Sequence, residues 1–107
     1  ALFIYNSVLQ VFWTEVGHAP EIILHSSIDL SSDWMDWKES RSVEILRPEF
    51  SWEGADAPLT SSVRSTAYGY VNQLRDPAVY IENGTFYLLY AVAGESGIAI
   101  AQLDMNI

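Results

Sequence analysis

The stretch that decides the fold reads LRDPAVYIENGTFYLLYAV over residues 74–92. Its Asn83-Gly84 dipeptide lies between two apolar runs and favours a type I′ hairpin, because both central residues of that turn need positive φ. We therefore expect antiparallel strands over Val79–Glu82 and Thr85–Val92. The run Phe86–Val92 is apolar on both faces, whereas an antiparallel sheet usually exposes one face to water. A sheet that contains this strand needs cover on both sides.

The same pattern occurs at the N-terminus. Residues 1–6 match residues 78–83, residues 8–13 match residues 85–90, and Gly17 falls on Gly94. After a small deletion, the match continues from residues 23–30 to residues 98–105. Few identities are involved, but turn, aromatic and aliphatic positions recur in the same order. An internal repeat of this kind indicates a fold built from stacked units.

Each copy is predicted to form an antiparallel sheet. The first copy should contain no helix longer than two turns within residues 1–30. Its four strands are expected at Leu2–Tyr5, Val8–Glu15, Glu21–Ile28 and Ser42–Leu46. The second copy adds a third strand at Gly97–Leu103 and has no fourth.

The predicted fold class is therefore all-β, with two antiparallel blade-like sheets that form part of a β-propeller and an incomplete second blade. Residues 1–47 would be the first blade and residues 77–107 the second. Residues 48–76 would be a long connecting segment that crosses one end of the blades. A two-sheet sandwich is the alternative architecture.

Composition excludes several function classes. Half of the 107 residues are hydrophobic and the net charge is −9, so the chain is not disordered, and nucleic acids and anionic membranes are not expected as partners. Cysteine is absent, which excludes thiolate metal sites, and the two histidines share no ligand spacing. We expect no metal and no cofactor. With no recognisable signal peptide or membrane span, a soluble protein of unknown compartment is expected.

Two segments of the chain resemble a known family. Leu74–Tyr80 and Asn83–Tyr90 are similar to the Asp-Pro blade opening of the five-bladed propeller glycosidases, which include arabinanases, xylosidases, invertases and levansucrases. Ala93–Gly97 and Trp52–Pro58 resemble segments of uncharacterised bacterial proteins of this type. The resemblance covers nearly the whole chain at the level of blades, and one fold of this kind hosts many functions.

The resemblance implies glycoside hydrolase-like chemistry, which needs two carboxylates on opposite sides of a sugar. They stand roughly 6.5–9.5 Å apart in inverting enzymes and about 5–5.5 Å apart in retaining ones. In the family the essential carboxylates come from early and middle blades, whereas this chain resembles the late blades. Only Asp76 matches the motif position. The chain is therefore expected to supply part of a carbohydrate-binding cleft without being catalytic alone.

Asp76 is the candidate catalytic residue, and Arg75 is a candidate for substrate binding. Asp76 precedes Pro77, which favours an extended backbone. Its carboxylate could accept a sugar hydroxyl, or it could accept backbone N–H bonds where the blade begins. Arg75 could hold a ligand, or it could pair with a nearby acid such as Asp56 or Glu53.

Three further residues are candidates for substrate binding. Glu95 and His18 occupy corresponding turns of the two copies, so both are expected at the same end of the blades. Glu95 could instead be an exposed turn residue. Trp52, like Trp34 and Trp37, could offer an aromatic face to a sugar beside a carboxylate, but we expect these tryptophans to pack between blades. His25 is predicted to be a strand histidine with a satisfied side chain.

The alternative function is a non-catalytic interaction module that assembles by oligomerising its blades, and a pseudo-enzyme remnant is a third reading. Each end of such an array would expose an apolar sheet face. We expect these faces to be built from Phe86, Leu88 and Tyr90, or from Leu9, Val11 and Trp13. An open strand edge at Gly97–Leu103 adds to this surface. We expect a homo-oligomer, with a two-fold dimer as the commonest form.

Overall fold

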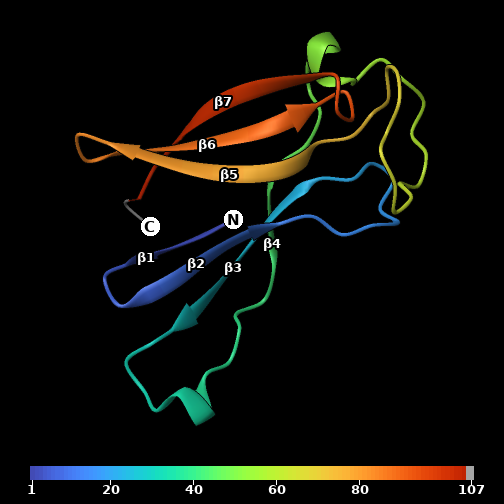
Figure 1. Ribbon diagram of the computed structural model, residues 1–107. Helices are drawn as coiled ribbons and strands as arrows, with labels where there is room; N and C mark the ends of the chain where they lie inside the picture. Colours follow the sequence, from blue (N-terminus) through green and yellow to red (C-terminus); the bar gives the residue numbers. More distant parts are fainter. Residues whose placement is uncertain (106–107) are drawn as a thin grey trace.

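The computed structural model describes residues 1–105 and contains two antiparallel sheets (Figure 1). The first sheet has the order β1 (Leu2–Tyr5), β2 (Val8–Trp13), β3 (Ile23–Asp29), β4 (Val43–Leu46). The second sheet has the order β5 (Arg75–Glu82), β6 (Thr85–Val92), β7 (Gly97–Leu103). Two short 3-10 helices, η1 (Trp34–Asp36) and η2 (Ser51–Glu53), complete the described elements, and no α-helix occurs among them. The predicted all-β class with a four-stranded and a three-stranded sheet is confirmed.

The strand register confirms the internal repeat. In the first sheet Phe12 lies opposite His25, and in the second the equivalent Leu89 lies opposite Ile100. The first hairpin behaves in the same way, because Leu2 is paired with Val11 as Val79 is paired with Leu88. The two sheets are therefore structural copies, residue by residue, over their first three strands.

The hairpin turns also repeat. Asn83 and Gly84 both have positive φ, of 50° and 75°, as the predicted type I′ turn requires. Asn6 and Ser7 occupy the same two positions in the first copy with φ values of 50° and 63°. Both turns end a strand at the expected residue.

The two sheets pack face to face, and the core lies between them (Figure 1). Phe12 and Ile23 of the first sheet meet Leu88 and Tyr90 of the second, and Leu74 closes the cluster. We call the surfaces in this contact the inner faces. Leu88, Tyr90 and the partly buried Phe86 thus belong to the inner face of the second sheet, so the expectation that they form an exposed end face is wrong. Phe86 packs on the ring of Phe3, and Leu88 and Tyr90 pack in the cluster with Phe12 and Ile23.

The outer faces of both sheets are apolar and exposed. On the second sheet this face carries Tyr80, Leu89, Ile98 and Ile100, and 80% of Ile98 is exposed. On the first sheet it carries the exposed Leu2 and Ile4, together with the half-buried Leu9, Val11 and Trp13, which lie on the outward face as predicted. Within the described residues, each sheet is covered on one face only.

Two tryptophans lie apart from this core. Trp34 and Trp37 are exposed in the loop between β3 and β4, so the expectation that they pack between blades is wrong. The loop is ordered locally instead, because Asp33 accepts a hydrogen bond from the Met35 N–H and Trp37 donates its indole N–H to Ser32 O. This loop projects away from the second sheet (Figure 1).

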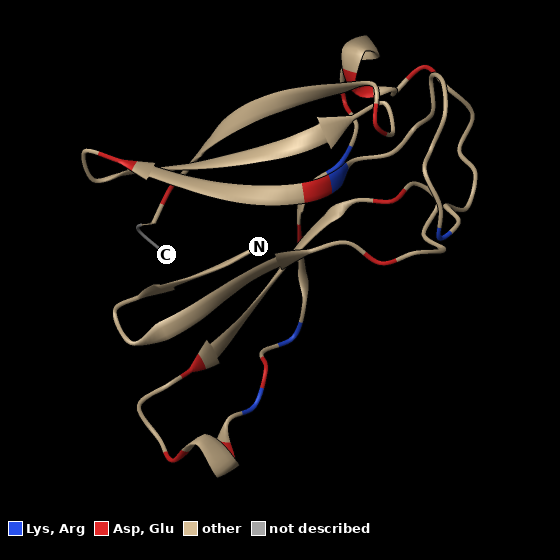
Figure 2. Ribbon diagram, in the orientation of Figure 1, with Lys and Arg blue, Asp and Glu red and all other residues tan. Residues whose placement is uncertain are grey.

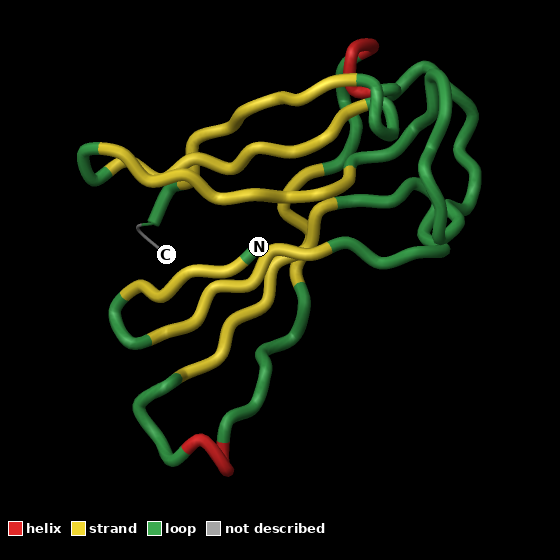
Figure 3. The backbone as a smooth tube through the Cα atoms, in the orientation of Figure 1, coloured by secondary structure: helices red, strands yellow, loops and turns green. Residues whose placement is uncertain are grey.

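The long segment between β4 and β5 lies with the β2–β3 and β6–β7 connections at one end of the two sheets (Figure 3). Close backbone contacts fix it there. A Cβ on Gly54 would approach Val71 O to 2.1 Å, so only glycine fits at that point. No helix of the described residues is long and apolar enough to cross a membrane.

Candidate functional site

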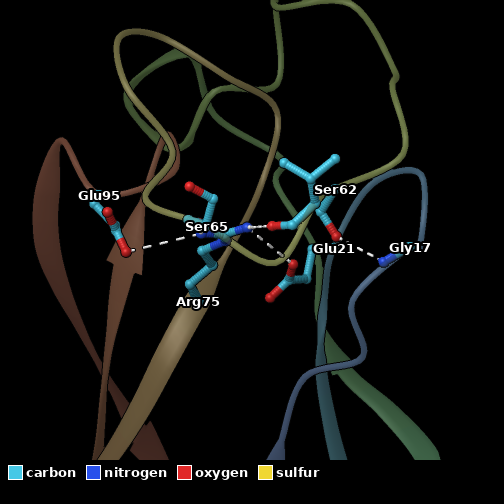
Figure 4. A network of polar contacts seen from close by, with 7 residues as sticks. Gly17, Glu21, Ser62, Ser65, Arg75 and Glu95 are labelled. Atoms are coloured by element: carbon cyan, nitrogen blue, oxygen red, sulfur yellow. Dashed lines mark hydrogen bonds and ion pairs between the residues drawn. The ribbon is translucent and has the colours of Figure 1, made fainter.

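The candidate site is built around Arg75 at the loop end of the two sheets (Figure 4). Arg75 is the first residue of β5 and is only 6% exposed. Its guanidinium donates hydrogen bonds to Ser65 O at 2.6 Å and to Val63 O at 2.8 Å. One buried cation therefore ties the connecting segment to the start of the second sheet.

Two carboxylates lie on either side of this guanidinium (Figure 4). Glu21 Oε1 is 3.5 Å from Nη2 and Glu95 Oε1 is 3.8 Å from Nη1. Arg75 thus pairs with acids, as one reading of the sequence held, but its partners are not Asp56 or Glu53. Glu21 comes from the segment before β3 and Glu95 from the turn between β6 and β7, so Arg75 connects both sheets.

The two ion pairs are loose. Arg75 Nε and Glu21 Oε1 are buried and make no hydrogen bond within the described residues, and the same holds for Asn72 Oδ1 and Gln73 Oε1. Buried polar atoms normally find partners, and leaving one without costs about 1–3 kcal/mol. Four buried polar atoms at this end of the molecule therefore make no hydrogen bond to a described residue.

Asp76 lies next to this network and adopts an unexpected backbone conformation. Its φ is 52°, although a residue before proline favours extended geometry. The ladder between β5 and β6 shifts register between Arg75 and Ala78, so Asp76 occupies a bulge. Strand pairing outweighs the extended preference of the residue before proline, since β5 pairs with β6 at Arg75 and again only from Ala78.

The Asp76 carboxylate has no hydrogen bond or ion pair to any described residue, so it does not accept the backbone N–H bonds that one reading predicted. Instead Asp76 lines a hollow of about 550 Å³ at the loop end of the outer face of the second sheet. Glu95 lines the same hollow, and its apolar floor consists of Ala78, Leu89, Ala91 and Ile98. The structure thus brings together two acidic candidates over an apolar floor.

His18 lies at this same end but does not reach the hollow. Its imidazole ring lies beside the Glu15 carboxylate, with His18 Nε2 2.8 Å from Glu15 Oε2. Its backbone carbonyl accepts from Ser62 N, and Gly17 N donates to Ser62 Oγ (Figure 4). The shared position of His18 and Glu95 at one end of the sheets is confirmed.

Trp52 is not part of the hollow either. It stacks on Phe50 with ring centroids 5.3 Å apart and is exposed, so it does not pack between the sheets. Its neighbour Glu53 is buried and serves the fold. Glu53 Oε1 accepts the backbone N–H groups of Glu49 and Phe50, and Oε2 accepts the hydroxyl of Tyr90.

His25 has the satisfied side chain that the sequence predicted. Its Nε2 is 2.6 Å from Gln10 Oε1, and burial lowers its pKa. Among the described residues, no three His, Cys, Asp or Glu side chains gather closely enough to hold a metal ion. The chemistry open to the hollow is that of its carboxylates, Asp76 and Glu95, which can accept hydrogen bonds from hydroxyl groups.

Sequence reasoning missed Glu21 and the pair formed by Glu53 and Tyr90. Glu21 was assigned to a strand, where a charged residue at the first position gives no sign of burial. Its backbone instead forms a parallel bridge with Gln73, a contact between residues far apart in the chain. The residues next to Glu21 in the sequence contain no pattern that predicts this contact.

Comparison with known proteins gives one informative match. No protein-family profile matches the chain, and no solved structure gives a significant match. An uncharacterised protein of Acanthamoeba polyphaga mimivirus is 44% identical over 96 residues, which cover 89% of this chain. The chain spans 27% of that relative's length. The similarity is thus to a viral protein, whereas the sequence resemblance had pointed to bacterial ones.

Proposed function

We propose that this chain supplies one wall of a carbohydrate-binding cleft in a repeat-built, all-β protein related to the propeller glycosidases. The observation that carries the proposal is the unpartnered Asp76 carboxylate beside Glu95, over the apolar floor of the hollow. Sugars present hydroxyl groups that donate to carboxylates, and they present C–H faces that fit apolar surfaces. Asp76 is also the residue at the Asp-Pro position of the family resemblance.

Two further observations support it. The hollow is bounded by a single sheet, so a neighbouring sheet would be needed to close a cleft. The mimivirus relative is several times longer than the matched region, which leaves room for further sheets in that protein. A single wall also explains why we expect no glycosidase turnover from this chain, because the chemistry needs two opposed carboxylates.

Sugar titration of the chain, followed by amide chemical shifts, tests the proposal. Arabinose, xylose, fructose and their short oligomers are the probes. We expect shifts confined to the amides around Asp76, Glu95 and Gly97, and a loss of most of them in Asp76→Asn. Asp36→Asn is the matched control, because it makes the same change in the exposed loop between β3 and β4.

Shifts that persist in Asp76→Asn, or that spread around Asp36, would overturn the proposal. An absence of any shift up to millimolar sugar would overturn it equally. The association of the chain is measured in the same samples by light scattering, so that a failure to bind sugar is separated from a failure to assemble.

A further inference from the structure

The two sheets contact each other through unlike faces. The first sheet uses Phe12 and Ile23, whose equivalents in the second copy are Leu89 and Ile98. Leu89 and Ile98 do not lie on the inner face of the second sheet, which is formed by the alternate positions such as Leu88. The second sheet therefore follows the first in the same orientation, as successive units of a stack do.

The reverse correspondence also holds. The inner face of the second sheet uses Leu88 and Tyr90, whose equivalents in the first copy are Val11 and Trp13. Val11 and Trp13 lie on the outer face of the first sheet, beside the exposed Leu2 and Ile4. The outer face of the second sheet is thus equivalent to the inner face of the first sheet. The outer face of the first sheet is equivalent to the inner face of the second.

The charge distribution leaves both faces free to associate. The strands carry few charged residues, and the acidic side chains that give the net charge of −9 lie mainly in loops and at strand ends (Figure 2). Leu2 and Ile4 are each 64% exposed, and Ile100 is 60% exposed. Apolar surface gathered in this way on both sides of a small chain usually marks an interface.

We propose that a second copy of this chain stacks head to tail on the first, with the outer face of its β1–β4 sheet on the outer face of the β5–β7 sheet. Val11 and Trp13 of the added copy would pack on Leu89 and Ile98. They would repeat the contact that Leu88 and Tyr90 make with Phe12 and Ile23. The contact is heterologous, in place of the two-fold contact expected from symmetry frequencies alone.

The internal interface also shows what such stacking leaves accessible. His18 is the equivalent of Glu95, and 40% of its side chain stays exposed although the second sheet covers its own sheet. A stacked copy would cover the apolar floor of the hollow and leave only its acidic rim accessible at the loop end, so stacking and the proposed sugar binding exclude each other on this face. The assembly proposal does not depend on carbohydrate binding, since it rests on the repeat and on the outer faces.

Complementary variants test the polarity of the contact. Ile4→Lys disables the outer face of the first sheet, and Ile100→Lys disables that of the second. Both side chains are exposed, so both variants should fold, which far-UV circular dichroism checks. Tyr68→Lys is the matched control, because it places the same charge on an exposed aromatic of the connecting segment.

Sedimentation velocity at rising micromolar concentration is the readout. We expect the wild type and Tyr68→Lys to associate, and each face variant alone to stay monomeric. An equimolar mixture of the two face variants should form a 1:1 dimer of doubled mass, because one intact face of each kind remains. This rescue by mixing is specific to a contact between unlike faces.

Three results would overturn the proposal. A monomeric wild type would show that no second copy uses these faces. Self-association of one face variant alone would indicate a two-fold contact through the other face. A mixture that stays monomeric would show that the two faces do not recognise each other.

Discussion

At the scale of single residues, the guanidinium of Arg75 is the polar group that joins the connecting segment to both sheets. It donates to two carbonyls of the connecting segment and lies between Glu21 and Glu95, which come from different sheets. Glu21 has no other cation within reach in the described residues. Removing the guanidinium would leave that carboxylate buried and uncompensated, which is far more costly than losing an exposed pair.

We therefore predict that Arg75→Met destabilises the fold by roughly 3 kcal/mol. Arg47→Met is the matched control, because Arg47 makes a two-pronged but exposed pair with Glu44. Its loss should cost less than about 1 kcal/mol. Urea unfolding of both variants gives the free energies, and equal losses would mean that Arg75 is not the tie between the sheets.

Tyr90 allows a second prediction at this scale. Burial, together with the charge of Glu53, raises the pKa of Tyr90 to about 12, above its ordinary value near 10. Between about pH 10 and pH 12 the unfolded chain releases this proton while the folded chain keeps it, so stability falls as pH rises. Tyr90→Phe should remove that part of the fall, although it is less stable at neutral pH because Glu53 loses a hydrogen bond.

Urea unfolding at about pH 9 and about pH 11 measures the effect. Tyr68→Phe serves as control, because it removes an exposed phenol from the connecting segment. An alkaline loss of stability as large in Tyr90→Phe as in the wild type would contradict the assignment.

Sequence reasoning found Arg75, Asp76 and Glu95 as candidates, but not how they are joined. It predicted that Arg75 pairs with an acid, yet the two partners are separated from it by long stretches of chain or by a hairpin. It also predicted an extended Asp76, because the rule for residues before proline is local. The bulge that reverses this preference arises from strand pairing, which a single residue pair does not reveal.

At the scale of elements, the two hairpins are equivalent and differ in one turn residue. Gly84 has φ of 75° and a Cβ there would meet no atom within 4 Å, so its role is conformational. Ser7 adopts φ of 63° at the matching position, where a residue with a Cβ pays about 1 kcal/mol relative to glycine.

We predict that Ser7→Gly stabilises the fold by about 1 kcal/mol and that Gly84→Ser destabilises it by a similar amount. Thermal unfolding followed by circular dichroism measures both, and the double variant should return close to the wild-type value. Changes of the same sign in the two single variants would show that the turns are not equivalent.

Turn chemistry also explains which strands could be predicted. The bounds of β1, β6 and β7 match the expectation because an Asn turn or a glycine lies next to each. The predicted strand from Glu21 was too early, since β3 begins at Ile23, and the strand from Val79 was too late, since β5 begins at Arg75. β3 begins where Ile23 pairs with Leu46, and β5 begins where Arg75 pairs with Ala91 beyond the bulge, so no signal in the adjacent residues marks either start.

At the scale of the whole molecule, β6 has two apolar faces, and the one that carries Leu88 turns inward. The sequence predicted cover on both faces, because Phe86–Val92 is apolar throughout. Alternation alone could not choose between Leu88 and Leu89. The choice comes from packing, because Phe3 and Phe12 of the first sheet meet the face that carries Leu88.

That choice leaves a small core and two open apolar faces, which couples stability to assembly. A partner that binds only the folded chain stabilises it in proportion to its concentration. If copies stack through their outer faces, the thermal midpoint of unfolding should therefore rise with protein concentration. Ile100→Lys lacks one of the two faces needed for homotypic stacking, so its midpoint should stay constant over the same range. Tyr68→Lys should follow the wild type, because its charge lies outside both faces. Differential scanning calorimetry from micromolar to millimolar protein measures all three, and a wild-type midpoint that does not move with concentration would contradict the stacking of unlike faces.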